Sequence, residues 1–316
     1  MDVRLTEAGE PAEDRIWARH RRLTGTVLVV GAGAVGGFLA EELARVGFSP
    51  VRLVDPKVLA VENLVRHPLG APHVGAPKAT ALAGQIRTAF PPCDAVGRQA
   101  DFTLLPADEQ RALVREADVV VAATDSAACQ RQVNAVALEV GRPAVFPAVW
   151  VDPRIRDAEV GEILWTDPTR RTPCYECAVA FRRGVADTQA ARGARVDIQL
   201  VALATAQVVT ALAHPADDRA AILDPRRTAI YLHGLTPTSP GVRATFPAIG
   251  LSSLNVRVPF PVRPCPACHA SRYTSLVPEE VGDETPGSPG RLSAWIALAA
   301  LVTVVAVVLV TAGLAT

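Results

Sequence analysis

The chain carries no net charge, because its 32 basic side chains are matched by 32 acidic ones. This balance argues against a globally basic protein that coats nucleic acid, and we expect no nucleic-acid partner. The beginning of the chain, MDVRLTEAGEPAEDR, is polar and lacks the apolar segment of a secretory signal. Because no such segment is present, the globular part is expected in the cytoplasm. We also find no internal repeat in the 316 residues.

Charge is also missing from the C-terminal end, where no charged side chain occurs from Leu292 to Thr316. A helix needs about 20 apolar residues to cross a bilayer core, whereas a buried core helix is usually shorter and carries a polar stripe. We therefore predict a transmembrane helix over residues 293–315. Arg291 precedes it and nothing basic follows it, which places the preceding domain in the cytoplasm as a single-pass, C-terminally anchored protein of the cell membrane. Residues 276–292 are rich in Pro, Gly and acid and are predicted to be a flexible linker.

Between the ends, apolar runs alternate with helical patterns, which is typical of βαβ units and a parallel sheet. TVLVV and PVRLVD predict strands around FLAEELARVG, which has helical spacing. A helix is predicted over 78–89, a strand in DVVVAATD, a helix over 126–140 that ends at Gly141, and a strand in PAVFPAVW.

Past residue 150 the pattern changes, and VGEILW, TAIYLH and LNVRVPF predict strands of a more antiparallel half around a helix over 197–214. We predict an α/β fold in which a Rossmann-like, mostly parallel sheet continues into an antiparallel half. The expected organisation is an N-terminal arm (1–25) and one domain (26–275) with a nucleotide-binding half (26–150) and a second half (151–275). A basic helix in the arm and a mobile loop over 181–196 are also expected.

Three glycines, Gly31, Gly33 and Gly36, form a GxGxxG motif between the first predicted strand and helix. Glycines let the backbone approach a phosphate, and a helix N-terminus stabilises its charge. Asp55 ends the next strand, where it can accept hydrogen bonds from ribose hydroxyls. NAD, FAD and ATP can all use this motif, so by itself it favours a dinucleotide oxidoreductase.

Further charged residues lie where the carboxyl ends of the strands meet. Arg66 and Lys78 follow Asp55, and Asp125 follows the next long strand. A dehydrogenase has no need for this group of residues. Nucleotidyl transfer does, because two cations can stabilise the charge on a triphosphate while an acid holds Mg2+.

In this arrangement the chain resembles the ThiF/MoeB/HesA family, which is related to ubiquitin-activating enzymes. The family pattern is a glycine turn, D-x(7)-N-L-x-R, G-x-x-K, and T-D at a strand end. Here it runs over about residues 15–268 as the glycine turn, Asp55, Asn63-Leu64-Val65-Arg66, Gly75-Ala76-Pro77-Lys78 and Thr124-Asp125. Many relatives carry a second acid two residues after the ribose aspartate, where this chain has Lys57.

The resemblance implies a ThiF-type adenylation domain. It would use ATP to activate the C-terminal carboxylate of a small ubiquitin-like or sulfur-carrier protein. Asp55 would bind ribose, and Asp125 would hold Mg2+. The residues implied to contact phosphates are Asn63, Arg66 and Lys78. The family also implies a homodimer in which an arginine of the N-terminal arm reaches ATP; the segment DRI (14–16) makes Arg15 the candidate, although Arg15 could equally belong to a solvated basic helix.

Two other functions stay open. A related branch uses ATP to cyclise a threonylcarbamoyl modification on tRNA, and members of that branch can carry a C-terminal membrane segment. A NAD-linked oxidoreductase or a nucleotide-binding membrane scaffold would use the glycine motif without transferring a nucleotidyl group.

Four cysteines form two CxxC motifs, Cys174-Tyr-Glu-Cys177 and Cys265-Pro-Ala-Cys268. Two such turns can complete a tetrahedral S4 site for Zn2+ with no open position, so the site is predicted to be structural. The resemblance adds to this, because ThiF/MoeB relatives often have the same pair. Disulfides do not suit a reducing cytoplasm, and we expect neither motif at the helix start that a thioredoxin-like redox pair uses.

The remaining cysteines, Cys93 and Cys129, are predicted to be small buried hydrophobes. From Ala178 to Pro264 the chain has no cysteine, so we expect no thioester with a partner on the loop of the second half.

Overall fold

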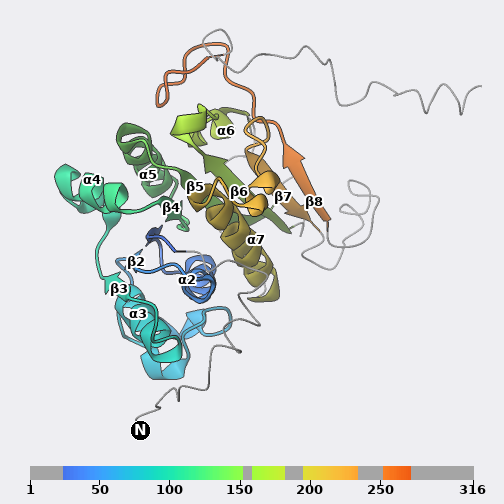
Figure 1. Cartoon of the computed structure of the whole chain (residues 1–316). Helices are drawn as coiled ribbons and strands as arrows, with labels where there is room; N and C mark the ends of the chain where they lie inside the picture. The colour runs from blue at the N-terminus through green and yellow to red at the C-terminus, as the bar shows by residue number, and fades with distance from the viewer. Residues whose placement is uncertain (1–23, 152–158, 182–194, 234–251, 272–316) are drawn as a thin grey trace, which may run out of the picture. The chain divides into compact units, whose positions relative to one another are not determined.

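The computed structural model of the protein describes residues 24–151, 159–181, 195–233 and 252–271 (Figure 1). The chain divides into two units, Met1–Leu276 and Val277–Thr316, and every described residue belongs to the first. The predicted helix of the N-terminal arm with Arg15, nearly all of the predicted loop at 181–196, the linker and the predicted transmembrane helix at 293–315 lie outside the described residues. They stay predictions.

One mixed sheet forms the centre of the described part, with its strands in the order β3-β2-β1-β4-β5-β6-β7-β8 (Figure 1). Parallel pairing joins β1 (Val27–Val30), β2 (Val51–Val54), β3 (Ala95–Arg98), β4 (Val119–Ala122) and β5 (Ala144–Val151). Antiparallel pairing then joins β5 to β6 (Glu159–Thr166), β7 (Ala229–His233) and β8 (Ser252–Val256). This confirms the predicted α/β fold, with a parallel half that continues into an antiparallel half.

The parallel strands are short and almost wholly apolar because both faces of the sheet are covered. Successive side chains of β1 point to opposite faces, as the two-residue period of a strand requires. Val27 and Val29 belong to the core on one face, and Leu28 and Val30 belong to the core on the other; all four are at most 3% exposed. β1 therefore contributes side chains to both hydrophobic cores.

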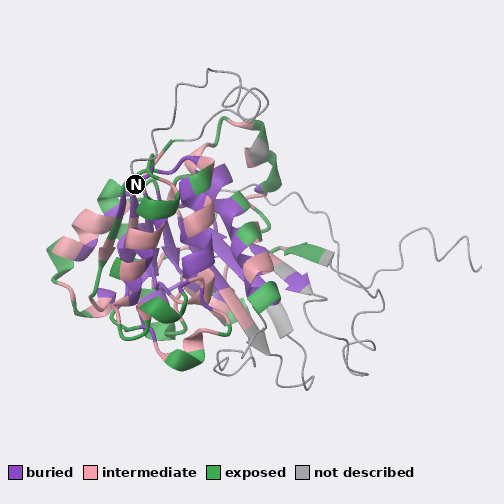
Figure 2. Ribbon diagram, turned by 90° about the horizontal axis from the view of Figure 1, so that it is seen from below, coloured by how far each residue is buried: buried purple, intermediate pink, exposed green. Residues whose placement is uncertain are grey.

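The helices cover these two faces as separate layers. The first face carries α2 (Ala34–Val46), α3 (Lys78–Ala89) and α7 (Arg195–Ala213). The second carries α4 (Ala107–Glu116), α5 (Ala127–Val140) and α6 (Tyr175–Phe181). Figure 2 shows the buried residues concentrated in the sheet and on the helix faces that meet it. Five short 3-10 helices lie in connections of the described part: η1 (Val61–Asn63), η2 (Ala71–His73), η3 (Phe102–Leu104), η4 (Pro168–Arg170) and η5 (Asp218–Ile222).

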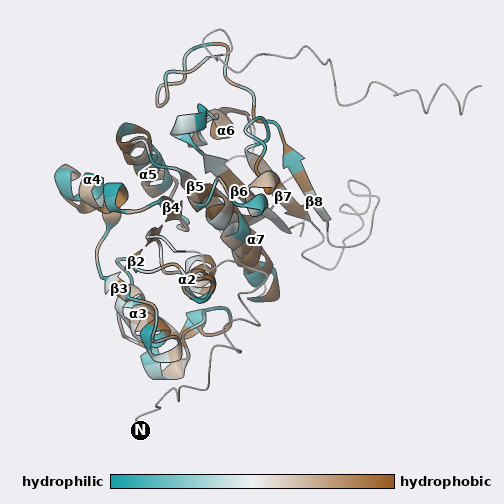
Figure 3. Ribbon diagram, viewed as in Figure 1, coloured by the Kyte–Doolittle hydropathy of each residue, from teal (hydrophilic) through white to brown (hydrophobic). Residues whose placement is uncertain are grey.

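The longest described helix, α7, is apolar over much of its surface (Figure 3). By length and composition it is the one helix of the described residues that could cross a bilayer, and 61% of its most apolar stretch is buried. It packs on α2 and against β5 and β6. Its apolar surface is therefore explained by its place in the core.

Three local features differ from the sequence prediction. Strand β3 and helix α4 were not expected, because an exposed edge strand and a strongly polar helix carry little apolar pattern. Helix α2 begins at Ala34, inside the glycine motif, instead of after it. The predicted strand LNVRVPF is displaced, since β8 covers Ser252–Val256 and ends before the Pro-containing part of that run.

Candidate functional site

A cavity of about 1130 Å3 lies at the carboxyl ends of the parallel strands, next to the turn between β1 and α2. Its wall continues over β5, β6 and α6, where Pro147, Ala148, Glu162, Tyr175 and Val179 line it. Seven of the residues predicted from the sequence line the cavity together: Gly31, Gly33, Asp55, Asn63, Arg66, Lys78 and Asp125. Gly36 packs beneath the turn, and Arg15 lies outside the described residues.

The glycine turn follows β1 closely and leaves room in front of it. Gly31 has a φ of +102°, and a Cβ atom there would collide with the carbonyl oxygen of Ala123 at the end of β4. A Cβ on Gly36 would collide with the carbonyl oxygen of Gly31, so both positions need glycine for backbone packing. A Cβ on Gly33 would meet nothing within 4 Å. Gly33 thus faces open cavity space at the N-terminus of α2.

Asp55 follows β2, is only 6% exposed, and fixes two segments of backbone. Its Oδ2 accepts a hydrogen bond from the N–H of Ala32 at 2.7 Å, and its Oδ1 accepts one from the N–H of Lys57 at 2.7 Å. The carboxylate therefore joins the glycine turn to the segment after β2. Each oxygen keeps acceptor capacity, which is what a ribose hydroxyl requires.

The segment after β2 is held by a short pairing with the residues before α3. The carbonyl of Lys57 accepts from the N–H of Lys78 at 3.0 Å, and the N–H of Leu59 donates to the carbonyl of Ala76 at 2.9 Å. The loop between these paired segments carries Asn63 and Arg66. The side-chain oxygen of Asn63 accepts from the N–H of Ala60 at 3.2 Å, so Asn63 shapes this loop besides lining the cavity.

The cavity is lined by four basic side chains, Lys57, Arg66, Lys78 and Arg131. Arg131 pairs with Glu176 at 3.0 Å, whereas Lys57 and Arg66 lie near Lys78. Lys78 is 8% exposed, and its burial lowers the pKa of its ammonium, while the carboxylate of Asp55 opposes that change. The charges of Lys57 and Arg66 also lower the pKa of Lys78, which shows that the three cations share one region. The Nζ of Lys57 lies 3.7 Å from Oδ1 of Asp125.

Asp125 stands in the turn between β4 and α5. The hydroxyl of Ser126 caps α5 by accepting from the N–H of Cys129 at 3.2 Å. Behind the turn, the side chain of Gln130 donates to the carbonyl of Thr124 at 3.1 Å and accepts from the hydroxyl of Tyr175 at 2.7 Å. The turn that presents Asp125 is thus supported by buried side chains of α5 and α6.

His67 is a residue of the site that the sequence did not reveal. It is 2% exposed, and its Nδ1 accepts from the N–H of Leu69 at 3.1 Å. The proton therefore sits on Nε2, which donates to the carbonyl of Ala32 in the glycine turn at 2.8 Å. Burial lowers the pKa of His67. The carbonyl of His67 accepts from the guanidinium of Arg195 at 2.6 Å, and that group also lies 4.6 Å from the ring centre of Phe38.

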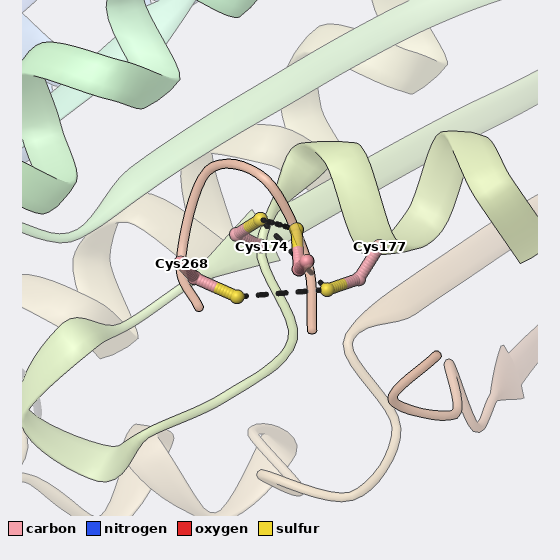
Figure 4. A group of neighbouring side chains, drawn as sticks. Cys174, Cys177 and Cys268 are labelled. Atoms are coloured by element: carbon pink, nitrogen blue, oxygen red, sulfur yellow. Dashed lines mark hydrogen bonds between the residues drawn. The ribbon is translucent and has the colours of Figure 1, made fainter. Parts of the chain in front are cut away.

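The four cysteines of the CxxC motifs come together between the start of α6 and the turn after β8. Figure 4 shows the sulfur atoms of Cys174, Cys177 and Cys268 pointing toward one another. The sulfur of Cys174 lies 3.9 Å from that of Cys177 and 3.7 Å from that of Cys265, and all four lie within 4.8 Å of one another. A tetrahedral zinc with Zn–S bonds of about 2.3 Å has sulfur–sulfur edges of roughly 3.8 Å, so this spacing fits zinc. Disulfides are about 2.05 Å long, and these thiols are free.

One expectation about this cluster was wrong. The first CxxC motif does lie at a helix start, because α6 begins at Tyr175, between its two cysteines. A redox pair is still a poor description, since each sulfur of this motif is next to one of the second motif: Cys177 lies 3.7 Å from Cys268. A four-sulfur cluster of this kind suits a closed metal site.

The two other cysteines are buried, as predicted. Cys93 is 2% exposed and Cys129 is 7% exposed. Burial raises the pKa of the Cys129 thiol to about 11 and also raises that of Cys93. Neither side chain supplies a thiolate near neutral pH, so neither suits a nucleophile.

Known proteins resemble the chain in sequence and in fold, and two relatives and one solved structure serve as examples. A sulfur carrier protein adenylyltransferase of Thermus thermophilus is 29% identical over 163 residues, which cover 50% of this chain and 57% of that protein. The ATP-dependent ubiquitin transferase-like protein Cap2 of Enterobacter hormaechei is 34% identical over 121 residues, which cover 38% of this chain and 19% of that protein. The chain thus spans less than two thirds of either relative.

The fold matches that of E. coli MccB in a crystal structure with AMPCPP and MccA. The TM-score is 0.56 at 18% identity, and the match covers 77% of this chain and 66% of that one. The model of the ThiF family matches residues 13–315. Because this match covers nearly the whole sequence, the protein belongs to the ThiF family.

Proposed function

We propose that the chain is an ATP-dependent adenylyltransferase that activates the C-terminal carboxylate of a small ubiquitin-like or sulfur-carrier protein. The observation that carries the proposal is the convergence of Arg66, Lys78 and Asp125 on one cavity beside the glycine turn. Two related proteins, named as a sulfur carrier protein adenylyltransferase and as an ATP-dependent ubiquitin transferase-like protein, support the same chemistry.

The nucleotide would lie with its ribose on Asp55 and its phosphates between the glycine turn and the cations. Gly33 leaves space there, and the N-terminus of α2 offers N–H groups and a favourable dipole. Arg66 and Lys78 would contact the triphosphate, with Asn63 shaping the loop between them. Since Lys78 is largely withdrawn from water, its attraction for a phosphate is weakly screened.

In the reaction, a carboxylate oxygen of the partner attacks the α-phosphorus of ATP and forms an acyl–phosphate bond. The bond from the α-phosphorus to its bridging oxygen breaks, and pyrophosphate leaves with the electron pair. No general base is needed, because the partner's carboxylate is already ionised. The part of the cavity over β5, β6 and α6 would hold the partner's C-terminal tail and orient it.

Asp125 would hold Mg2+, which would neutralise phosphate charge when bound. Carboxylate oxygen is a ligand that Mg2+ prefers, and Asp125 is exposed to the cavity. The four cysteines would hold Zn2+ as a structural ion that joins α6 to the turn after β8. Neither ion takes the role of nucleophile in this proposal.

We further propose that residues 293–315 anchor the chain in the cell membrane with the catalytic domain in the cytoplasm. The support is their uncharged, apolar sequence. A homodimer in which Arg15 of one protomer reaches ATP of the other rests on the resemblance alone.

The test is ATP–pyrophosphate exchange in the presence of purified small proteins that end in Gly-Gly. We expect exchange that depends on such a carrier and falls about 100- to 1,000-fold in Arg66→Ala. Arg115→Ala removes an exposed arginine of α4 that does not line the cavity, and it should keep full exchange. Absence of exchange with every carrier, or equal exchange in Arg66→Ala, would refute the proposal. Stimulation of ATP cleavage by tRNA instead would favour the tRNA-modifying branch.

A further inference from the structure

The sequence uses lysine in only one place. Of its 32 basic residues, Lys57 and Lys78 are the only lysines, and both line the nucleotide cavity. Lysine differs from arginine because it carries a compact point charge on a flexible stem, whereas guanidinium is a planar fork. A chain that otherwise employs arginine thus places both of its lysines in the lining of this cavity, one buried and one exposed.

The backbone of Lys57 is held by two hydrogen bonds, whereas its side chain is largely exposed. Its N–H donates to Asp55 at 2.7 Å, and its carbonyl accepts from Lys78 at 3.0 Å. The Lys57 side chain is 63% exposed. The side chain therefore starts from a set position next to Asp55, and rotation about the bonds of its exposed stem can carry the ammonium to another partner.

The ammonium of Lys57 forms an ion pair with Asp125, the residue proposed to hold Mg2+. Its Nζ is 3.7 Å from Oδ1 of Asp125, whose side chain is 59% exposed. Ion pairs between exposed groups add less than about fivefold to an equilibrium constant. A divalent ion at Asp125 can therefore displace Lys57 readily, whereas without metal Lys57 reduces the repulsion between Asp125 and a phosphate.

We propose that Lys57 is a built-in substitute for the metal: it neutralises Asp125 when no Mg2+ is bound and leaves Asp125 when Mg2+ arrives. The inference rests on the proposed function, because it takes ATP as the ligand of the cavity. Lys57 and Mg2+ then compete for one carboxylate. If Lys57 no longer acts once Mg2+ is bound, its loss lowers ATP affinity without metal and so increases the factor by which Mg2+ strengthens ATP binding.

Calorimetric titration of the full chain with ATP, in EDTA and in saturating Mg2+, tests this. Lys57→Met keeps the length of the stem and removes the charge. We expect it to weaken ATP binding about tenfold in EDTA and less than about threefold in Mg2+, because the metal then covers Asp125. In an Asp125→Asn background, Lys57→Met should no longer weaken ATP binding, because there is no carboxylate left to neutralise. The double variant Lys57→Met/Asp125→Asn should therefore bind ATP in EDTA nearly as well as Asp125→Asn alone. Arg115→Met serves as the control and should change neither affinity.

Equal weakening in both conditions would make Lys57 an ordinary phosphate contact and would overturn the proposal, as would no weakening at all. If wild type fails to bind ATP in either condition, the proposed function fails with it. If ATP binds and Arg66→Ala matters while Lys57→Met does not, only the present inference fails.

A second measurement needs no variant. An amine-reactive reagent has two lysine targets in this chain, and mass spectrometry can follow each. In the ATP complex, we expect Lys57 to react several-fold faster with Mg2+ than with EDTA, because Mg2+ releases its ammonium, whereas Lys78 stays protected in both. Unchanged labelling of Lys57 on addition of Mg2+ would contradict the competition.

Discussion

His67 provides the sharpest test of how the site is assembled. Its ring joins the glycine turn to the loop that carries Arg66. The Nε2–H donates to the carbonyl of Ala32, and Nδ1 accepts from the N–H of Leu69. In His67→Ala both of these backbone groups lose a partner, and the residue is 2% exposed. Each orphaned buried group costs about 1–3 kcal/mol, so we expect a loss of roughly 2–6 kcal/mol in the free energy of unfolding.

The same residue predicts a pH dependence with a definite sign. Burial lowers the pKa of His67 in the folded chain below its ordinary value of 6.5. As pH falls below 6.5, the unfolded chain takes up a proton before the folded chain does, and the free energy of unfolding decreases. The stabilisation by neutral His67 is therefore complete above the unfolded pKa and is lost progressively below it.

Urea denaturation of wild type, His67→Ala and His67→Gln measures both effects. Glutamine keeps an N–H donor for Ala32 and cannot titrate, so it should lose less stability than alanine. The stability difference between wild type and His67→Gln should shrink from about pH 7.5 to about pH 5.5. A loss under about 1 kcal/mol in His67→Ala, or a difference that grows as pH falls, would refute this account of the ring.

Two further predictions concern the glycine turn and the cysteine cluster. Gly33→Ala should change the free energy of unfolding by less than about 1 kcal/mol and weaken ATP binding more than about tenfold, because its Cβ enters only cavity space. Gly31→Ala should instead lower the free energy of unfolding by about 2–3 kcal/mol in urea titrations, since its φ is +102° and its Cβ would meet Ala123. Cys177→Ala should abolish zinc in elemental analysis and lower the melting temperature by about 10 °C, while Cys129→Ala keeps its zinc. Full zinc content in Cys177→Ala would contradict the four-thiol site.

The place of the site was predictable because parallel strands order their ends. Asp55 follows β2 and Asp125 follows β4, and β1 pairs with both of these strands. The acids and the glycine turn after β1 must then meet at one edge of the sheet. Local apolar runs show where strands end, and the crossover rule supplies their order. The cavity at this edge follows from those two facts.

Other features depend on side-chain directions that no local pattern contains. His67 and Lys57 look like ordinary polar loop residues in the sequence, and their partners, Ala32 and Asp125, are far away along the chain. Strand β3 and helix α4 were missed because their burial is partial. The helix at the first CxxC motif was missed because α6 has only seven residues, too few for a helical period to show.

The cysteine cluster and the cavity beside the glycine turn are connected through Tyr175. Tyr175, between the first two cysteines, donates through its N–H to Asn134 at 3.1 Å and through its hydroxyl to Gln130, which in turn holds the carbonyl of Thr124. Cys174 and Cys265 are separated by 91 positions, so bringing them together restricts a long stretch of chain. A metal ion that supplied this cross-link would also fix Tyr175. Because Tyr175 supports the turn that presents Asp125, an ion held by the four cysteines would stabilise the cavity wall at a distance from the proposed ATP site.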